Sequence, residues 1–176
     1  TIREGRAALT TSFGVFKYMA LYSLIQFISV LILYSMESNL GDWMFLYIDL
    51  VITTTVAVLM GHTAAYPRLV AKRPPGSLVA PVNMFSIIIH IIIVCVIQTG
   101  AFLYLTEQPW YVHPHSTDKD EVNVLTQVTT VIFCVSSFQY IILAFIFSKG
   151  PPYRKPIWTN VPFLLSLIIL TGITTF

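Results

Sequence analysis

The sequence predicts an all-α membrane protein built as a bundle of five transmembrane helices. Hydrophobic residues make up 56% of the 176 residues and charged residues only 10%, whereas typical soluble domains have about 45–50% and about 25%. The apolar residues form five long runs, and most basic residues gather in alternate connections between them. This composition excludes a free-standing soluble enzyme. Because the net charge is only +2, we expect no nucleic-acid partner.

The five runs have the lengths that membrane-spanning helices need. An α-helix rises about 1.5 Å per residue, so about 20 residues cross a hydrocarbon core of about 30 Å. The first four runs reach this length, and the fifth is slightly shorter. Residues 1–12 precede the first run and are expected on the cytosolic side, and residues 13–176 form the transmembrane domain in the lipid bilayer. The predicted spans are 13–36, 40–61, 82–105, 126–148 and 160–176.

The charges outside the runs predict the orientation of the chain. If the spans simply alternate, nine of the ten basic residues lie on one side of the membrane. The other side carries six acids and one base, Lys119. Cytosolic connections are enriched in Lys and Arg, so we expect the N-terminus on the cytosolic side. The nine bases are Arg3, Arg6, Lys17, Arg68, Lys72, Arg73, Lys149, Arg154 and Lys155, and the six acids are Glu37, Asp42, Glu107, Asp118, Asp120 and Glu121.

One ionisable side chain is expected deep in the membrane. Asp49 lies about nine residues inside the second run, where a carboxylate costs roughly 2.5–3.5 kcal/mol on insertion scales. Phe45 precedes it by four residues and Thr53 follows it by four, so the three share one stripe of an α-helix. Charged residues at such depth usually face a transport pathway or a partner.

The first run offers a matching polar row. Tyr22 and Gln26 are four residues apart. The short turn at residues 38–41 makes the first two helices antiparallel neighbours, and it places Gln26 within about one helical turn of the depth of Asp49.

One carboxylate, two aromatic faces and an amide suit an elongated organic cation. A carboxylate pairs with an ammonium group, and an aromatic face attracts one through cation–π contact. A hard metal ion needs more oxygen ligands than one Asp and a few hydroxyls. The alternative is that Asp49 only bonds a neighbouring helix and the aromatic rings only pack.

The histidines are weaker candidates. His90 stands alone in an isoleucine-rich run, and a neutral histidine hydrogen-bonded between helices is the expected interpretation. His113 and His115, with Asp118 and Asp120 nearby, have the chemistry to bind metal or sense acidity. We expect them in a solvated loop.

The remaining polar candidates are on the third and fourth spans. Gln139 and Tyr140 either line a path or make interhelical hydrogen bonds. Cys95 and Cys134 are expected to pack as small apolar residues. The sequence contains no phosphate-binding loop and no hydrolase or metalloprotease motif.

Two long stretches carry a resemblance to a known family. Residues 2–6 (IREGR) resemble the hinge by which P-type ATPases pass from the phosphorylation domain into their fifth transmembrane helix. Residues 3–26 and 38–50 are similar to the type V group, and within it to the polyamine-transporting subgroup of late endosomes and lysosomes. Shorter matches are QPWY (108–111), SSFQY (136–140) and FSKG (147–150).

The resemblance implies a fold position and a function. The five spans would be helices five to nine of a ten-helix transport domain, and residues 1–12 the hinge. The family moves polyamines such as spermine and spermidine from lumen to cytosol, driven by ATP through an aspartyl phosphate with Mg²⁺. ATP and Mg²⁺ would be bound by other parts of the same polypeptide. The family's substrate-lining residues match Tyr22, Gln26, Phe45 and Asp49 here.

Two other functions remain open at this point. A type V pump for inorganic cations, or for transmembrane segments of other proteins, has the same architecture. A non-enzymatic multispan channel or scaffold protein also fits five apolar runs.

Overall fold

The protein is a bundle of α-helices. The computed structural model describes residues 2–36, 38–69, 71, 76–77, 79–111 and 126–175. These described residues contain no strand, and an isolated bridge joins Ala65 to Arg154. The predicted all-α fold class is confirmed. The elements are α1 (Ile2–Tyr34), α2 (Asp42–Leu46), the π-helix η1 (Tyr47–Thr53), α3 (Thr54–Met60), α4 (Pro81–Thr106), α5 (Gln127–Phe147), the 3₁₀ turn η2 (Ile157–Thr159) and α6 (Val161–Thr175).

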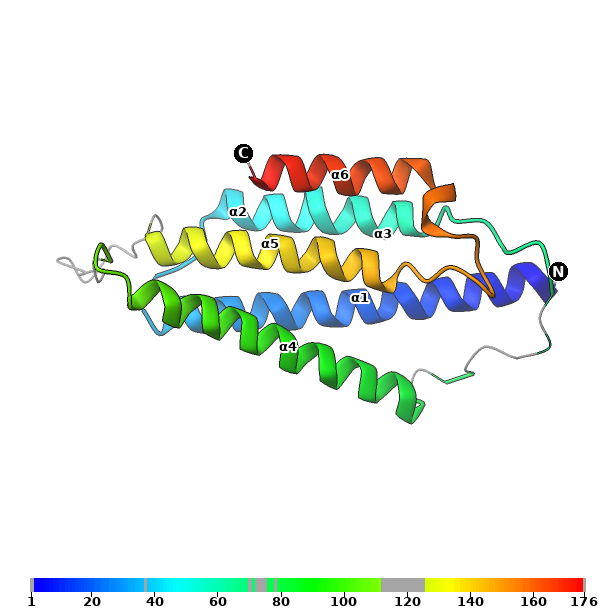
Figure 1. Cartoon of the computed structure of the whole chain (residues 1–176), viewed down its shortest axis with the longest axis horizontal. Helices are drawn as coiled ribbons and strands as arrows, with labels where there is room; N and C mark the ends of the chain where they lie inside the picture. The colour runs from blue at the N-terminus through cyan, green and yellow to red at the C-terminus, as the bar shows by residue number, and fades with distance from the viewer. Residues whose placement is uncertain are drawn as a thin grey trace.

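The helices run up and down beside one another (Figure 1). Four stretches of the described chain are long and apolar enough to cross a membrane: α1, the continuous α2–η1–α3 stretch, α4 and α5. The fifth apolar helix, α6, has 15 residues. Helix α1 is longer than its predicted span because it begins at Ile2. Its 33 residues extend about 50 Å at 1.5 Å per residue, so residues 2–12 continue the same helix.

Helix α5 lies at the centre of the bundle. It contacts α1, α4, η1 and α6. In its most apolar stretch of 18 residues 50% is buried inside the bundle, compared with 11% in the corresponding stretch of α4. The larger core cluster joins Leu21 of α1, Ile52 of η1, Ala144 of α5 and Leu167 of α6. A smaller cluster around Leu33 packs near the opposite end of α1 from the N-terminus.

Hydroxyl side chains within α1 are satisfied by the helix itself. Thr10, Thr11, Ser12, Ser23 and Ser29 each donate a hydrogen bond to the carbonyl four residues earlier. A polar group without a partner is costly in hydrocarbon, so this local bonding lets an apolar helix carry hydroxyls.

The outer surface of the bundle is apolar, as expected for helices in lipid. Large exposed apolar side chains occur on every long helix, including Phe27, Leu50, Phe85, Ile92, Phe145 and Ile169. A contiguous apolar surface of this kind is unusual on soluble proteins.

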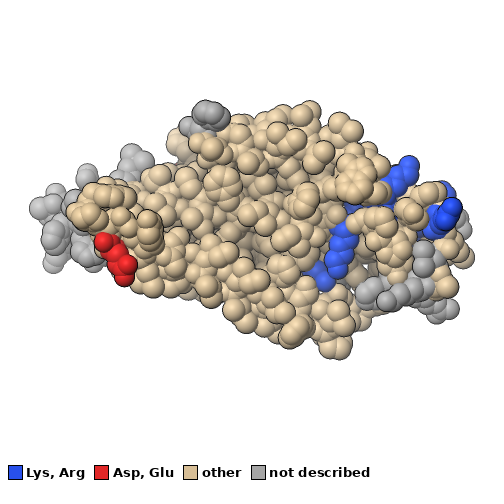
Figure 2. All heavy atoms as spheres, viewed as in Figure 1, with Lys and Arg blue, Asp and Glu red and all other residues tan. Residues whose placement is uncertain are grey.

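The charges separate between the two ends of the bundle (Figure 2). Blue Lys and Arg side chains gather at the end where α1 begins, and the red acidic patch that is visible in this view lies toward the other end. The described residues therefore have the predicted charge separation. Several residues of the prediction lie outside the described residues: Glu37, Lys72, Arg73, Asp118, Lys119, Asp120 and Glu121.

At the basic end, two connections that are distant in sequence are joined. The α3–α4 connection pairs with the α5–α6 connection through a bridge between Ala65 and Arg154. The Tyr66 N–H donates to the Tyr153 carbonyl at 3.1 Å, and the Lys155 N–H donates to the Ala64 carbonyl at 3.0 Å.

The buried Arg154 side chain links these connections to the end of α3. It is only 1% exposed, and its guanidinium donates to the carbonyl of Met60, the last residue of α3. Asn160 adds a second bond to the same helix end, from its Nδ2 to the Leu59 carbonyl at 2.8 Å. Burial lowers the pKa of Arg154 by desolvating its charge, but a guanidinium remains protonated in proteins. A positive charge therefore caps the negative end of the α3 dipole.

Candidate substrate-binding site

The backbone around Asp49 departs from the predicted α-helix. Residues Tyr47–Thr53 form a π-helix. Both the N–H and the hydroxyl of Thr54 donate to the Asp49 carbonyl, the hydroxyl at 2.9 Å. A π-helix closes each turn with an i→i+5 bond and occurs frequently at functional sites. The wider turn changes the spacing of side chains on either side of Asp49.

Asp49 meets the first helix through Tyr22. The Tyr22 hydroxyl donates a hydrogen bond to Oδ1 of Asp49. The Tyr22 ring also packs against Tyr140 of α5, with ring centroids 5.4 Å apart and planes tilted by 48°. Three elements, α1, η1 and α5, therefore converge on this carboxylate. Asp49 itself is exposed on the described part of the chain, so its second oxygen is open to a ligand.

Buried hydroxyls surround this junction. The hydroxyls of Tyr18, Thr53 and Tyr140 have no hydrogen-bond partner within the described part of the chain. Tyr18 and Tyr140 are completely buried and Thr53 is 6% exposed. Buried polar groups without a partner are uncommon. Three such hydroxyls near one carboxylate make this region unusually polar for the interior of the bundle.

Gln26 and Phe45 lie further from the carboxylate than Tyr22. Gln26 is half-buried and its side chain interacts with the Tyr22 hydroxyl from one turn along α1. Phe45 is also half-buried, and it packs against the smaller core cluster with Leu33 and Leu40. The structure thus brings Tyr22, Gln26 and Asp49 together, and it places Phe45 beside the cluster toward the acidic end.

Sequence reasoning did not identify the π-helix or assign Tyr140 to the site. Tyr140 belongs there because its ring packs on Tyr22, whose hydroxyl bonds Asp49. The one signal in the sequence was the run Thr53–Thr55 after Asp49, since Thr54 provides the hydroxyl that completes the wide turn.

A second polar cluster is separate from Asp49. The Gln98 amide on α4 is completely buried and donates to Ser29 Oγ at 2.9 Å, Ser136 Oγ at 3.1 Å and Gln139 Oε1 at 3.0 Å. Gln139 in turn donates to the Val94 carbonyl at 3.4 Å. These bonds join α1, α4 and α5, so Gln139 takes part in interhelical bonding.

We expect Gln98→Leu to loosen α4 from the bundle. Leu has a similar size but leaves Ser29, Ser136 and Gln139 without their shared donor, at a cost of about 1–2 kcal/mol for interhelical hydrogen bonds in membranes. The full-length protein that contains this chain is heated and then analysed by size-exclusion chromatography. The temperature at which half of the folded protein is lost from its peak should be lower in the variant. Thr99→Val is the matched control, because Thr99 is the exposed neighbour on the same helix. Equal losses in both variants would contradict this role.

The histidine and cysteine predictions have different outcomes. His90 bonds the Ser86 carbonyl of its own helix at 2.6 Å, so the predicted interhelical bond is wrong. Its contact with α5 is a ring packing against Phe147, with centroids 5.1 Å apart. Cys95 and Cys134 are free thiols of intermediate exposure. His113 and His115 lie outside the described residues.

The arrangement around Asp49 is suited to an organic cation. It offers one carboxylate oxygen beside two tyrosine rings, and an ammonium group binds both features. The described residues contain no group of three His, Cys, Asp or Glu side chains that would hold a metal ion.

Comparisons with known proteins identify relatives over nearly the whole chain. It is 52% identical over 172 residues to polyamine-transporting ATPase 13A2 of Mus musculus, an alignment that covers 98% of this chain and 15% of that protein. It is 45% identical over 190 residues to polyamine-transporting ATPase 13A3 of Homo sapiens, covering 96% of this chain and 16% of that protein. It is 43% identical over 171 residues to the vacuolar cation-transporting ATPase YPK9 of Saccharomyces cerevisiae, covering 97% and 12%.

No protein-family model matches the chain. The chain spans less than one fifth of the length of these relatives. Within that span the identity is high, and it includes the Tyr22 and Asp49 helices. The chain therefore belongs to the type V P-type ATPases, in the group that contains the polyamine-transporting ATPases.

Proposed function

We propose that this chain is the membrane-transport part of an ATP-driven pump that moves polyamines such as spermine and spermidine from lumen to cytosol. The observation that carries the proposal is the exposed Asp49 carboxylate, held by the Tyr22 hydroxyl beside the Tyr140 ring. Two relatives are named polyamine-transporting ATPases, which gives the organic cation a specific chemical class.

The proposed substrate path combines Tyr22, Gln26, Phe45 and Asp49. Asp49 neutralises one ammonium group of the polyamine, and the Tyr22 ring supplies a cation–π contact. Phe45, nearer the acidic end, would contact the apolar carbon segment between two ammonium groups. A linear polyamine suits this lining because its charges are separated by methylene segments.

The energy source lies in other parts of the same polypeptide in this proposal. ATP and Mg²⁺ would be bound there, because the present sequence has no phosphate-binding loop and its described residues have no metal cluster. Residues 1–12 would then be the hinge that transmits the phosphorylation cycle, and the unbroken α1 helix from Ile2 to Tyr34 supports a rigid connection to the site.

We place the protein in the late endosomal or lysosomal membrane with its basic end in the cytosol. Basic connections favour the cytosolic side. With this orientation the acidic end of the bundle would face the lumen, where it would attract a polyamine before entry.

The proposal is tested on the full-length protein by measuring ATP hydrolysis with spermine, spermidine and a panel of inorganic cations. We expect polyamines to stimulate turnover and the metals to have little effect. A pump for inorganic cations is the second candidate, since one relative is named a vacuolar cation-transporting ATPase. Stimulation by metals alone would favour that candidate, and no ATP hydrolysis at all would favour a channel or scaffold.

A further inference from the structure

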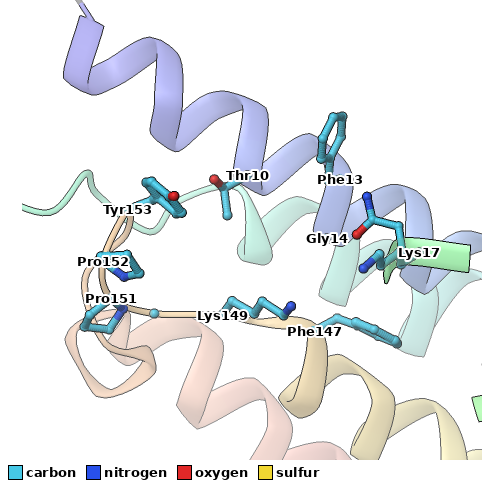
Figure 3. Close-up of a pocket in the computed structure, with 11 residues that line it drawn as sticks. Thr10, Phe13, Gly14, Lys17, Phe147, Lys149, Pro151, Pro152 and Tyr153 are labelled. Atoms are coloured by element: carbon cyan, nitrogen blue, oxygen red, sulfur yellow. The ribbon is translucent and has the colours of Figure 1, made fainter. Parts of the chain in front are cut away.

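A cavity opens at the basic end of the bundle, away from Asp49. It lies between residues 10–17 of α1, the start of α4 and the α5–α6 connection, with a volume of about 240 Å³ (Figure 3). Its lining combines apolar and basic side chains. The lining residues are Thr10, Phe13, Gly14, Lys17, Asn83, Phe147, Lys149, Gly150, Pro151, Pro152 and Tyr153.

Two lysines from different elements point toward this space (Figure 3). Lys17 on α1 is only 5% exposed, although a lysine is almost never buried without a partner. Within the described chain, neither Lys17 nor Lys149 makes a hydrogen bond or ion pair, and the two ammonium groups repel each other. The cavity therefore contains two positive charges that the described protein does not neutralise.

The described acids are unable to neutralise this pair. Glu4 forms an ion pair with Arg3, and Asp49 accepts the Tyr22 hydrogen bond. Asp42 begins α2 and Glu107 follows α4, both at the opposite end of the bundle. An external anion is the simplest way to balance a buried lysine beside a second lysine.

We propose that this cavity binds the phosphate headgroup of an anionic membrane lipid. Basic pockets between transmembrane helices on the cytoplasmic side suit such headgroups, and this cavity lies where the bases of the bundle gather. The lysines would hold the phosphate, while Phe13 and Phe147 line the same cavity and suit its apolar part. The exposed side chains of Phe16 and Met19, further along α1, offer a surface for the acyl chains.

A lipid fits this site better than a soluble phosphate. The cavity adjoins helices whose outer surfaces are apolar, and an acyl chain on that surface gains free energy from burial that a soluble ion lacks. The headgroup would also tie α1 to the α5–α6 connection, since one lysine comes from each.

The test uses the full-length protein in vesicles of phosphatidylcholine containing phosphatidic acid, with bound lipid measured by native mass spectrometry. We expect phosphatidic acid to remain bound in preference to phosphatidylcholine. Each of the variants Lys17→Gln and Lys149→Gln should weaken its retention about fivefold. Lys149 is exposed, so its replacement leaves the packing intact even if Lys17→Gln folds poorly. The readout does not depend on transport, so it separates this proposal from the pump function.

Lys155→Gln is the matched control, because Lys155 is an exposed base on the same connection but does not line the cavity. We expect this variant to retain phosphatidic acid like the unaltered protein. Equal loss in Lys155→Gln and Lys149→Gln would overturn the site in favour of general surface charge. Unchanged retention in Lys149→Gln would overturn it as well. Displacement of the lipid by inorganic phosphate at low concentration would assign the cavity to a soluble anion instead.

Discussion

Replacing Asp49 by Asn in the full-length protein should raise the spermine concentration for half-maximal ATPase stimulation about 10- to 100-fold. Asn has nearly the same size, and its amide oxygen still accepts the Tyr22 hydrogen bond. The variant therefore removes the charge and little else. A hydrogen bond to a charged group contributes about 1.5–3 kcal/mol, and each 1.4 kcal/mol is about tenfold in affinity.

Two further variants make this result specific. Tyr22→Phe keeps the ring and the carboxylate but removes the hydroxyl donor to Asp49, so we expect a smaller rise of about two- to tenfold, because the hydroxyl positions the carboxylate and the charge itself remains. Glu107→Gln is the charge-matched control, because Glu107 is an exposed acid that follows α4. Its half-maximal spermine concentration should change by no more than about twofold, because a single exposed charge at the acidic end attracts spermine only weakly through salt solution. Normal spermine stimulation in Asp49→Asn would remove Asp49 from the substrate site.

Replacing Arg154 by Met should expose the end of α3 to solvent exchange. Met fills part of the same space, but it loses the charge and the hydrogen bond to the Met60 carbonyl. The expected cost is about 2 kcal/mol, which corresponds to about 30-fold faster local opening. Hydrogen exchange measured by mass spectrometry on peptides covering residues 57–66 gives this rate directly.

The neighbouring lysine provides the comparison for Arg154. Lys155 follows it in the same connection but is exposed, so Lys155→Met should change exchange at α3 by no more than about twofold, as usual for surface substitutions. Arg154→Lys keeps the charge without the planar fork and should fall between the two. The capping role would be refuted by identical exchange in Arg154→Met and Lys155→Met.

The long helices were predictable because the bilayer leaves few alternatives. A segment of about 20 apolar residues has to satisfy its own backbone in hydrocarbon, and an α-helix does so within one segment. Runs such as 82–105 and 126–148 therefore became α4 and α5 almost residue for residue. The charge separation was predictable for the same reason, since charged groups stay out of the hydrocarbon.

The geometry at Asp49 was only partly predictable. Counting residues from the short turn at 38–41 predicted that Tyr22 and Gln26 lie near the depth of Asp49. The structure agrees, because the Tyr22 hydroxyl donates a hydrogen bond to the Asp49 carboxylate. The prediction that Phe45 and Asp49 share one face assumed α-helical spacing, whereas Tyr47–Thr53 form a π-helix. Such a change in turn depends on backbone bonds such as the one from the Thr54 N–H to the Asp49 carbonyl, and the hydrophobic pattern of the sequence does not reveal these bonds.

The sequence alone determined that this protein is a helical membrane bundle with a charged residue at depth and bases at one end. Those features follow from transfer energies of single residues, which depend little on the partners of each residue. The tertiary structure decided which side chains meet: Tyr140 with Tyr22, Arg154 with the end of α3, and Lys17 with Lys149 around one cavity. These contacts depend on how the helices are rotated and packed against the central α5, and that packing joins residues more than 90 positions apart.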